Sequence, residues 1–142
     1  MTPSQIDLIQ ESFKKVQPIS EAAAALFYKR LFEIAPEVRP LFKRDISEQG
    51  RLLMAILAAA VSLLRQPDKL VPAVEDLGRR HAGYGVKPEH FTPVGQALIW
   101  TLEQGLGEAF TPQVREAWLA LYETVQHVML KGMQQGSSAA AG

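Results

Sequence analysis

The stretch that decides the fold is residues 76–86, which read DLGRRHAGYGV. Leu77, His81 and Tyr84 recur there at positions i, i+4 and i+7, the spacing that places side chains on one face of an α-helix. Glycines follow two and four residues after the histidine, and glycine readily takes the left-handed conformation that closes a helix. The sequence therefore predicts a helix that carries one inward-facing histidine just before a turn.

A single histidine in this setting has two interpretations. It can offer one ring nitrogen as the axial ligand of a haem iron, or it can be a buried histidine that is simply hydrogen-bonded, which is the commoner role. His81 is the one histidine with apolar residues on both sides. His90 is expected at a helix start, and His127 lies about 140° around its helix from Tyr122, so both are expected to face water.

Composition limits the classes of function. The 142 residues, 47% of them hydrophobic, suffice for one domain with one core. The 15 basic and 15 acidic residues cancel, so we expect no nucleic-acid partner. The absence of cysteine excludes disulfides, thiolate metal sites and cysteine nucleophiles. The N-terminus lacks the apolar core of a signal peptide, and the longest apolar run, residues 52–64, is too short to span a bilayer. We therefore expect a cytoplasmic protein with no membrane partner.

The rest of the chain predicts helices joined by short turns, with no strand. Thr2 and Gln5 form a capping box around Pro3, which suits the first helical position, and this helix runs to Pro18. The proline-rich segment 36–42 suits a short turn. Further helices are expected over residues 20–34, from Ser47 as the cap to about Arg65, over 69–82, from 87–90 to about 105, and from Thr111-Pro112 onward. The sequence predicts an all-α fold of six principal helices.

Several motifs resemble those of the globins. Phe42, Gln49, Leu53 and His81 follow the segment PEVRP in the order and spacing of that family. The second half of the chain resembles neuroglobins and their bacterial relatives, in residues 77–87, Phe91, Val94-Gly95, 109–112 and 117–118. Residues 27–29 and 36–42 resemble the globin domains of bacterial flavohaemoglobins. The resemblance covers about residues 4–134.

This resemblance implies a three-over-three helical sandwich around a haem pocket. The globin domain would span residues 1–135, and residues 136–142, GSSAAAG, are expected to be a disordered tail. His81 would be the only metal ligand, bound to the iron of haem b (iron protoporphyrin IX), with its other ring nitrogen donating to a carbonyl near Leu77. The other residues that the resemblance implies for cofactor binding are Phe42, Leu53, Leu57, Leu77, Arg80, Val86, Phe91, Val94 and Leu98. Arg51 is the alternative to Arg80 as the partner of the haem propionates.

Tyr28 and Gln49 would form the distal polar pair, and so the catalytic residues. A phenol and an amide both donate hydrogen bonds, which dioxygen taken up by a ferrous haem accepts well. Without the resemblance, Tyr28 reads as a boundary tyrosine with its hydroxyl in water. On periodicity alone, Gln49 reads more readily as a surface glutamine at a helix start.

The chain also departs from both groups of globins that it resembles. Gln49 stands where neuroglobins carry a distal histidine, so closed ligation of the iron by two histidines is not expected. Phe91 and Met133 stand where flavohaemoglobins support the proximal histidine with a tyrosine and a glutamate. We expect no flavin domain to follow, so any turnover would take electrons from a separate reductase.

Three functions remain in competition. The first is a haem globin that binds dioxygen reversibly and with high affinity, and that supports oxidation of nitric oxide to nitrate with an external reductase. The second is an oxygen carrier, an oxygen store or a haem-based gas sensor without turnover. The third is a haem-free signalling globin, which the presence of His81, Phe42 and both distal donors disfavours. In the first two, the partners are dioxygen, nitric oxide and other small gaseous ligands.

Overall fold

The chain folds into helices alone over the part that the structure describes. The structure, a computed structural model, describes residues 1–141 and the side chains of residues 1–135. Its elements are α1 (Pro3–Val16), η1 (Gln17–Ile19), α2 (Ser20–Ile34), η2 (Pro36–Leu41), α3 (Ile46–Ser62), α4 (Pro67–Gly83), η3 (Pro88–His90), α5 (Phe91–Leu106), η4 (Gly107–Ala109) and α6 (Pro112–Ala141), where η marks a 3-10 helix. The predicted all-α fold with six principal helices is confirmed for these residues.

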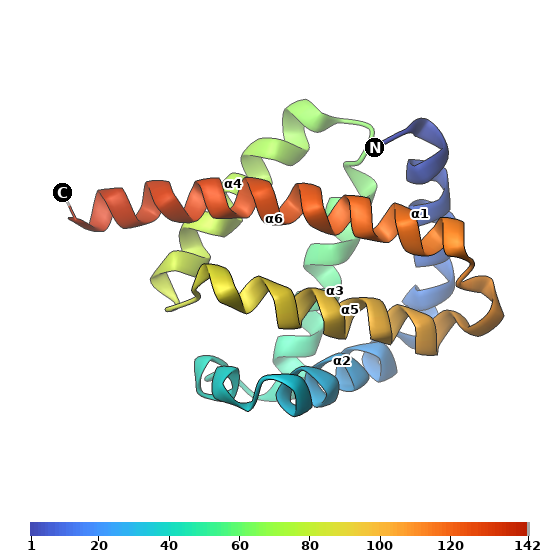
Figure 1. The fold of residues 1–142 in the computed structure, drawn as a ribbon, viewed down its shortest axis with the longest axis horizontal. Helices are drawn as coiled ribbons and strands as arrows, with labels where there is room; N and C mark the ends of the chain where they lie inside the picture. Colours follow the sequence, from blue (N-terminus) through green and yellow to red (C-terminus); the bar gives the residue numbers. More distant parts are fainter. Residues whose placement is uncertain (142) are drawn as a thin grey trace.

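The six α-helices form two crossed layers. In Figure 1, α2, α5 and α6 run roughly horizontally, and α1, α3 and α4 cross behind them at a steep angle. The main packing pairs are α4 with α6, α2 with α5 and with α3, and α1 with α6. This arrangement is the expected three-over-three sandwich. In this arrangement α3 and α4, although consecutive in the sequence, make little contact with each other.

Two helix starts follow local sequence rules. At α1, the Thr2 hydroxyl accepts the Gln5 backbone N–H at 3.1 Å, and the Gln5 side chain accepts the Thr2 N–H at 3.0 Å. At α6, the Thr111 hydroxyl accepts the Val114 N–H at 3.2 Å. These hydrogen bonds confirm both predicted caps. Each cap could be predicted because it joins residues only three positions apart.

Other helix boundaries differ from the prediction. Ser47 is not the cap of α3, because the helix begins at Ile46 and Ser47 is already inside it. The cap is Asp45, whose backbone carbonyl accepts the Gln49 N–H at 2.9 Å. α4 begins at Pro67 rather than Lys69, since proline at the first helical position needs no hydrogen-bond partner. A 3-10 turn, η3, precedes α5 where one continuous helix was expected.

The core consists of two hydrophobic clusters. The larger one includes Phe13 of α1 and Trp118 of α6, whose indole N–H donates to the Ser12 hydroxyl at 2.9 Å. The smaller one lies between α2, η2 and α5 and includes Phe27, Tyr28, Leu31, Ala35, Val38 and Ala97. Leu98 packs against both clusters. The two clusters are therefore joined through α5.

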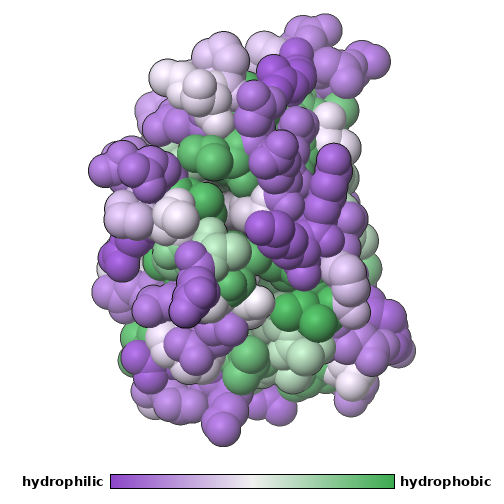
Figure 2. All heavy atoms as spheres, turned by 90° about the vertical axis from the view of Figure 1, so that its right-hand side faces the viewer, coloured by the Kyte–Doolittle hydropathy of each residue, from purple (hydrophilic) through white to green (hydrophobic). Residues whose placement is uncertain are grey.

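The outer surface is mixed. At the end of the molecule that carries α1 and the turn between α5 and α6, hydrophobic residues show in several patches between hydrophilic ones (Figure 2). Over the described residues, no helix combines the length and the apolar character needed to cross a membrane. The predicted tail falls on residues whose side chains, and in Gly142 the backbone too, lie outside the described part, so its disorder stays a prediction.

Candidate functional site

His81 lies in the last turn of α4 with one ring nitrogen already engaged. Its Nδ1 is 2.8 Å from the carbonyl oxygen of Leu77, one turn earlier. A carbonyl can only accept, so we assign the proton to Nδ1, which leaves Nε2 with a free lone pair. Burial lowers the pKa of His81; the Leu77 contact opposes this shift and the neighbouring Arg80 adds to it. The imidazole is thus kept in the neutral form that ligates metals.

The turn after His81 is built around its own carbonyl group. That oxygen accepts the Tyr84 N–H at 3.0 Å and the Val86 N–H at 3.3 Å. Gly85 has a backbone φ of +86°, a conformation that residues other than glycine rarely adopt. The inward position expected for Tyr84 is wrong, because this residue lies beyond the end of α4 and is 59% exposed. Its ring nevertheless contacts the His81 ring, at 5.6 Å between centroids.

α3 carries apolar side chains that the chain itself does not cover. Leu52 and Ile56, one turn apart, are 38% and 40% exposed. Leu53 and Leu57, the next residues on this side of the helix, are half-buried. α3 makes little contact with α4, so the helix that bears His81 does not cover them. An exposed apolar helix face of this kind suits a flat apolar group that would cover it.

Tyr28 and Gln49 are brought together by α2 and α3. Tyr28 is only 3% exposed, which rules out a boundary tyrosine with its hydroxyl in water. Its ring packs edge-on against Phe27 and Phe42, at 5.0 and 5.3 Å between centroids. Its hydroxyl donates to the backbone carbonyl of Gln49 at 3.4 Å. Burial raises the pKa of Tyr28 to about 12, although a hydrogen bond from Gln49 lowers it somewhat.

The other residues expected around a cofactor divide between the two clusters. Phe42, Leu53, Val94 and Leu98 pack, partly buried, against the smaller cluster. Leu57, Leu77, Val86 and again Leu98 pack against the larger one, of which Phe91 is a buried member. The fold thus places the predicted residues along the border of both clusters. Their contact with a cofactor stays a prediction.

The remaining candidates are the two arginines considered for the haem propionates and the residues expected beside His81. Arg80 is exposed and pairs with Asp76 at 3.1 Å, while Arg51 is exposed on α3. Phe91 and Met133 are both buried. The nearby phenol of Tyr122 donates its hydroxyl to the Phe91 carbonyl, so it supports the backbone of α5 rather than His81. Over the described residues, the side-chain hydrogen bond of His81 is the one between its Nδ1 and the Leu77 carbonyl.

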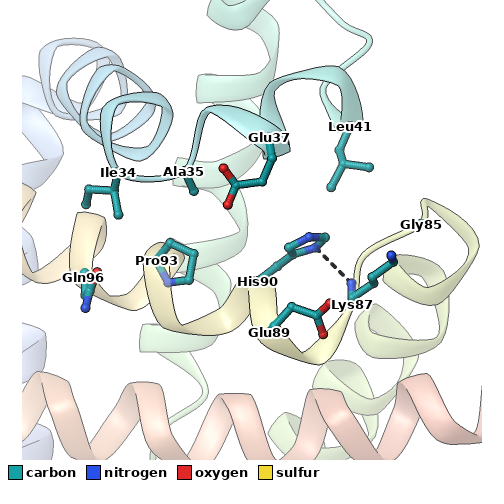
Figure 3. Close-up of a pocket in the computed structure, with 10 residues that line it drawn as sticks. All are labelled: Ile34, Ala35, Glu37, Leu41, Gly85, Lys87, Glu89, His90, Pro93 and Gln96. Carbon is teal, nitrogen blue, oxygen red and sulfur yellow. Dashed lines mark hydrogen bonds between the residues drawn. The ribbon is translucent and has the colours of Figure 1, made fainter.

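A cavity that the sequence did not predict lies beside this site. It has a volume of about 620 Å³ and opens between η2 and the start of α5 (Figure 3). His90 and Glu37 reach into it from opposite walls, and the His90 Nδ1 accepts the Lys87 N–H at 3.0 Å. The only local signal was the three-residue spacing of Lys87 and His90. The cavity itself depends on η2, about fifty residues away in the chain, so the sequence pattern did not indicate it.

A second cavity, of about 20 Å³, is internal and apolar. Leu53 and Leu57 of α3 form one of its walls, and Ala23 and Ala24 of α2 form another. The alanines that line this cavity belong to α2 and not to the alanine-rich helix α3. Among the described residues, no three His, Asp or Glu side chains are grouped closely enough to hold a metal ion.

Comparisons with known proteins agree with this architecture. The globin family model matches residues 25–129. The chain is 31% identical to a neuroglobin of Tetraodon nigroviridis over 140 residues, covering 89% of this chain and 88% of that protein. It is 28% identical to a flavohemoprotein of Bacillus subtilis over 144 residues, covering 96% of this chain but only 36% of the relative. The chain therefore spans about a third of the length of the flavohemoproteins it matches.

Solved structures show the same fold. An engineered carbene transferase from Rhodothermus marinus, described as a candidate nitric oxide dioxygenase, superposes with a TM-score of 0.90 at 26% identity, covering 100% of this chain and 99% of that one. A hexacoordinated haem protein from a tardigrade superposes with a TM-score of 0.85 at 18% identity, covering 94% and 96%. Because the family match spans most of the chain and the fold agrees with it throughout, this protein belongs to the globin family, and that membership implies that it binds haem and small gaseous ligands.

Proposed function

We propose that this globin holds haem b between α3 and α4, with His81 Nε2 as the only protein ligand of the iron. The observation that carries the proposal is the His81 imidazole, neutral and with Nδ1 held by Leu77, at the edge of a helix pair that leaves apolar side chains uncovered. Haem b would supply a ferrous iron that takes up dioxygen and gives the one electron with which dioxygen and nitric oxide form nitrate, so that the iron becomes ferric.

The chain's own residues orient this site and exclude water from it. The Leu77 carbonyl keeps the proton on Nδ1, so Nε2 stays available as a ligand. Phe42 and Leu53, which pack against the smaller cluster, would border the distal side. Phe91 and Val86, which belong to or pack against the larger cluster, would border the proximal side. These apolar walls lower the local dielectric, which strengthens any hydrogen bond made inside.

Tyr28 and Gln49 supply the distal hydrogen-bond donors. Because the pKa of Tyr28 is raised to about 12, its phenol keeps its proton at neutral pH and remains a donor. At 3.4 Å its bond to the Gln49 carbonyl is long, so a stronger acceptor inside the site can compete for the hydroxyl. A donor pair of this kind gives high affinity for dioxygen, because each hydrogen bond formed must break before the ligand leaves.

We further propose that the globin supports oxidation of nitric oxide to nitrate, with electrons from a separate reductase. A distal pair that retains dioxygen suits chemistry on it better than delivery of it, since a carrier must release its cargo. The internal cavity behind Leu53 and Leu57 offers room for a small apolar gas. The likeness to flavohemoproteins and to a candidate nitric oxide dioxygenase supports the same assignment.

Rapid mixing of the oxygenated protein with nitric oxide tests this activity. We expect stoichiometric nitrate and conversion to the ferric spectrum in one turnover, with further turnovers only when a reductase is added. Displacement of dioxygen without nitrate would instead leave an oxygen carrier, store or sensor.

Absorption spectra test the ligand assignment separately. We expect the wild-type protein to show the Soret band of bound haem, and His81→Ala to lose most of its haem. His127→Ala is the matched control, because His127 is exposed on α6. We expect this variant to retain its haem fully. Unchanged haem binding in His81→Ala would contradict the site.

A further inference from the structure

Tyr84 is an exposed aromatic residue with an unusual neighbour. It is 59% exposed, more than any other large hydrophobic side chain in residues 1–135. Its ring nevertheless lies 5.6 Å from the His81 ring, with 61° between the ring planes. Among the described side chains, this is the one aromatic pair that includes a histidine. The contact of this exposed ring with the proposed iron ligand therefore needs a structural explanation.

The backbone, not burial, holds Tyr84 in this place. Its N–H is bonded to the His81 carbonyl at 3.0 Å, and the Val86 N–H reaches the same oxygen at 3.3 Å. Gly85, between them, takes φ of +86° and lets the chain turn back. The turn therefore determines where the tyrosine ring lies, even though water surrounds most of it.

Hydrogen bonding restrains the His81 ring at one described point. Its Nδ1 is held by the Leu77 carbonyl, and a single hydrogen bond does not by itself fix the tilt of the ring. The buried side chains of Phe91 and Met133 offer no hydrogen bond to it. A ring packed against the imidazole at an angle supplies the missing restraint, because aromatic contacts of this geometry are favourable in themselves.

We propose that Tyr84 is a positioning residue, whose ring holds the His81 imidazole at a fixed tilt and shields it from water. The proposal rests on the proposed function, since it takes His81 to be the iron ligand. The contact is made by the ring, so the hydroxyl is not required. Phenylalanine at this position is therefore expected to preserve it, and alanine to abolish it.

The test compares haem-loaded wild-type protein with Tyr84→Ala and Tyr84→Phe. Leu119→Ala serves as the matched control, because Leu119 is 42% exposed on α6 and takes no part in the contact. Two quantities are measured: the iron–histidine stretching band of the ferrous protein, by resonance Raman, and the rate of haem transfer to excess apomyoglobin. For Tyr84→Ala we expect a shifted or broadened band and about two- to tenfold faster haem release. Tyr84→Phe and Leu119→Ala should match the wild type.

The outcomes separate this proposal from the previous one. A wild-type protein without an iron–histidine band would contradict the assignment of His81 itself. A wild-type band that Tyr84→Ala leaves unchanged, with unchanged haem release, would overturn the role of Tyr84 alone. Equal changes in Tyr84→Ala and Tyr84→Phe would also overturn it, because they would assign the effect to the hydroxyl.

Discussion

At the scale of single residues, Tyr28 and Gln49 show how two helices share one polar site. The phenol comes from α2 and the amide from α3, and the hydroxyl meets the Gln49 backbone within an otherwise aromatic surrounding. In the proposed site, both side chains would donate to the same small ligand. Their effects on that ligand should therefore be coupled rather than independent.

Substitution of the distal pair should speed dioxygen release. A hydrogen bond to a partly charged acceptor contributes about 1.5–3 kcal/mol, or roughly ten- to a hundredfold in the dissociation rate for the dominant donor. We expect faster release in Tyr28→Phe and Gln49→Leu, and less than the product of the two effects in the double variant. Stopped-flow or flash photolysis measures all three rates. Rates equal to wild type throughout would show that these side chains point elsewhere.

The raised pKa of Tyr28 predicts a loss of stability in alkali. Below about pH 10 the phenol is protonated in both the folded and the unfolded chain. Between pH 10 and about 12 only the unfolded chain releases the proton, so the free energy of unfolding falls by about 1.4 kcal/mol per pH unit from this group. Urea unfolding at pH 8, 10 and 11 should show a steeper decline in wild type than in Tyr28→Phe. Parallel declines would refute this origin.

At the scale of elements, the position of His81 depends on how closely α4 packs on α6. The two backbones meet at two glycines, Gly78 of α4 and Gly132 of α6. A methyl group at Gly78 would overlap the Met129 carbonyl, and one at Gly132 would overlap the Glu75 carbonyl. Because backbone atoms cannot move aside as a side chain can, these glycines set the distance between the helices.

Gly78→Ala should therefore push α4 away from α6. We expect a loss of about 1–3 kcal/mol in the free energy of unfolding, the usual cost of overpacking, together with weaker haem retention three residues further on at His81. Gly83→Ala is the control, because its added methyl group meets nothing within 4 Å, and it should be neutral or stabilising by up to about 1 kcal/mol. Urea unfolding decides the matter, and equal stabilities in the two variants would contradict the packing argument.

At the scale of the whole molecule, the two cores are joined incompletely. Leu98 packs against both, but α3 and α4 contribute little contact to each other and leave Leu52 and Ile56 exposed. A haem in this place would complete the fold as well as the chemistry.

Removal of haem should accordingly destabilise the protein. A ligand at about 1,000 times its dissociation constant adds roughly 4 kcal/mol to the folded state. We expect the haem-free protein to melt at a lower temperature and to bind a hydrophobic dye, which added haem displaces. His81→Ala should gain much less from added haem. Identical melting curves with and without haem would contradict a cofactor that bridges the cores.

Local rules of sequence were enough for much of this fold. The caps at Thr2 and Thr111 join residues three positions apart, so local sequence rules predict them. The contact of His81 with the Leu77 carbonyl, one turn earlier, was implied by the resemblance to globins. Helical periodicity predicted all six principal helices, with boundaries within a few residues of those in the structure. The family motifs then indicated which side chains to compare around one pocket.

Only the tertiary structure decided the remainder. Tyr84 has the helical spacing of an inward residue, yet the chain leaves the helix at Gly83 and exposes it. The approach of Tyr28 to the Gln49 carbonyl and the cavity between Glu37 and His90 depend on how α2 and η2 dock against α3 and α5. Helical periodicity specifies which face a side chain occupies, but contacts between residues distant in sequence depend on how whole helices pack, and that is settled by the core and not by any local pattern.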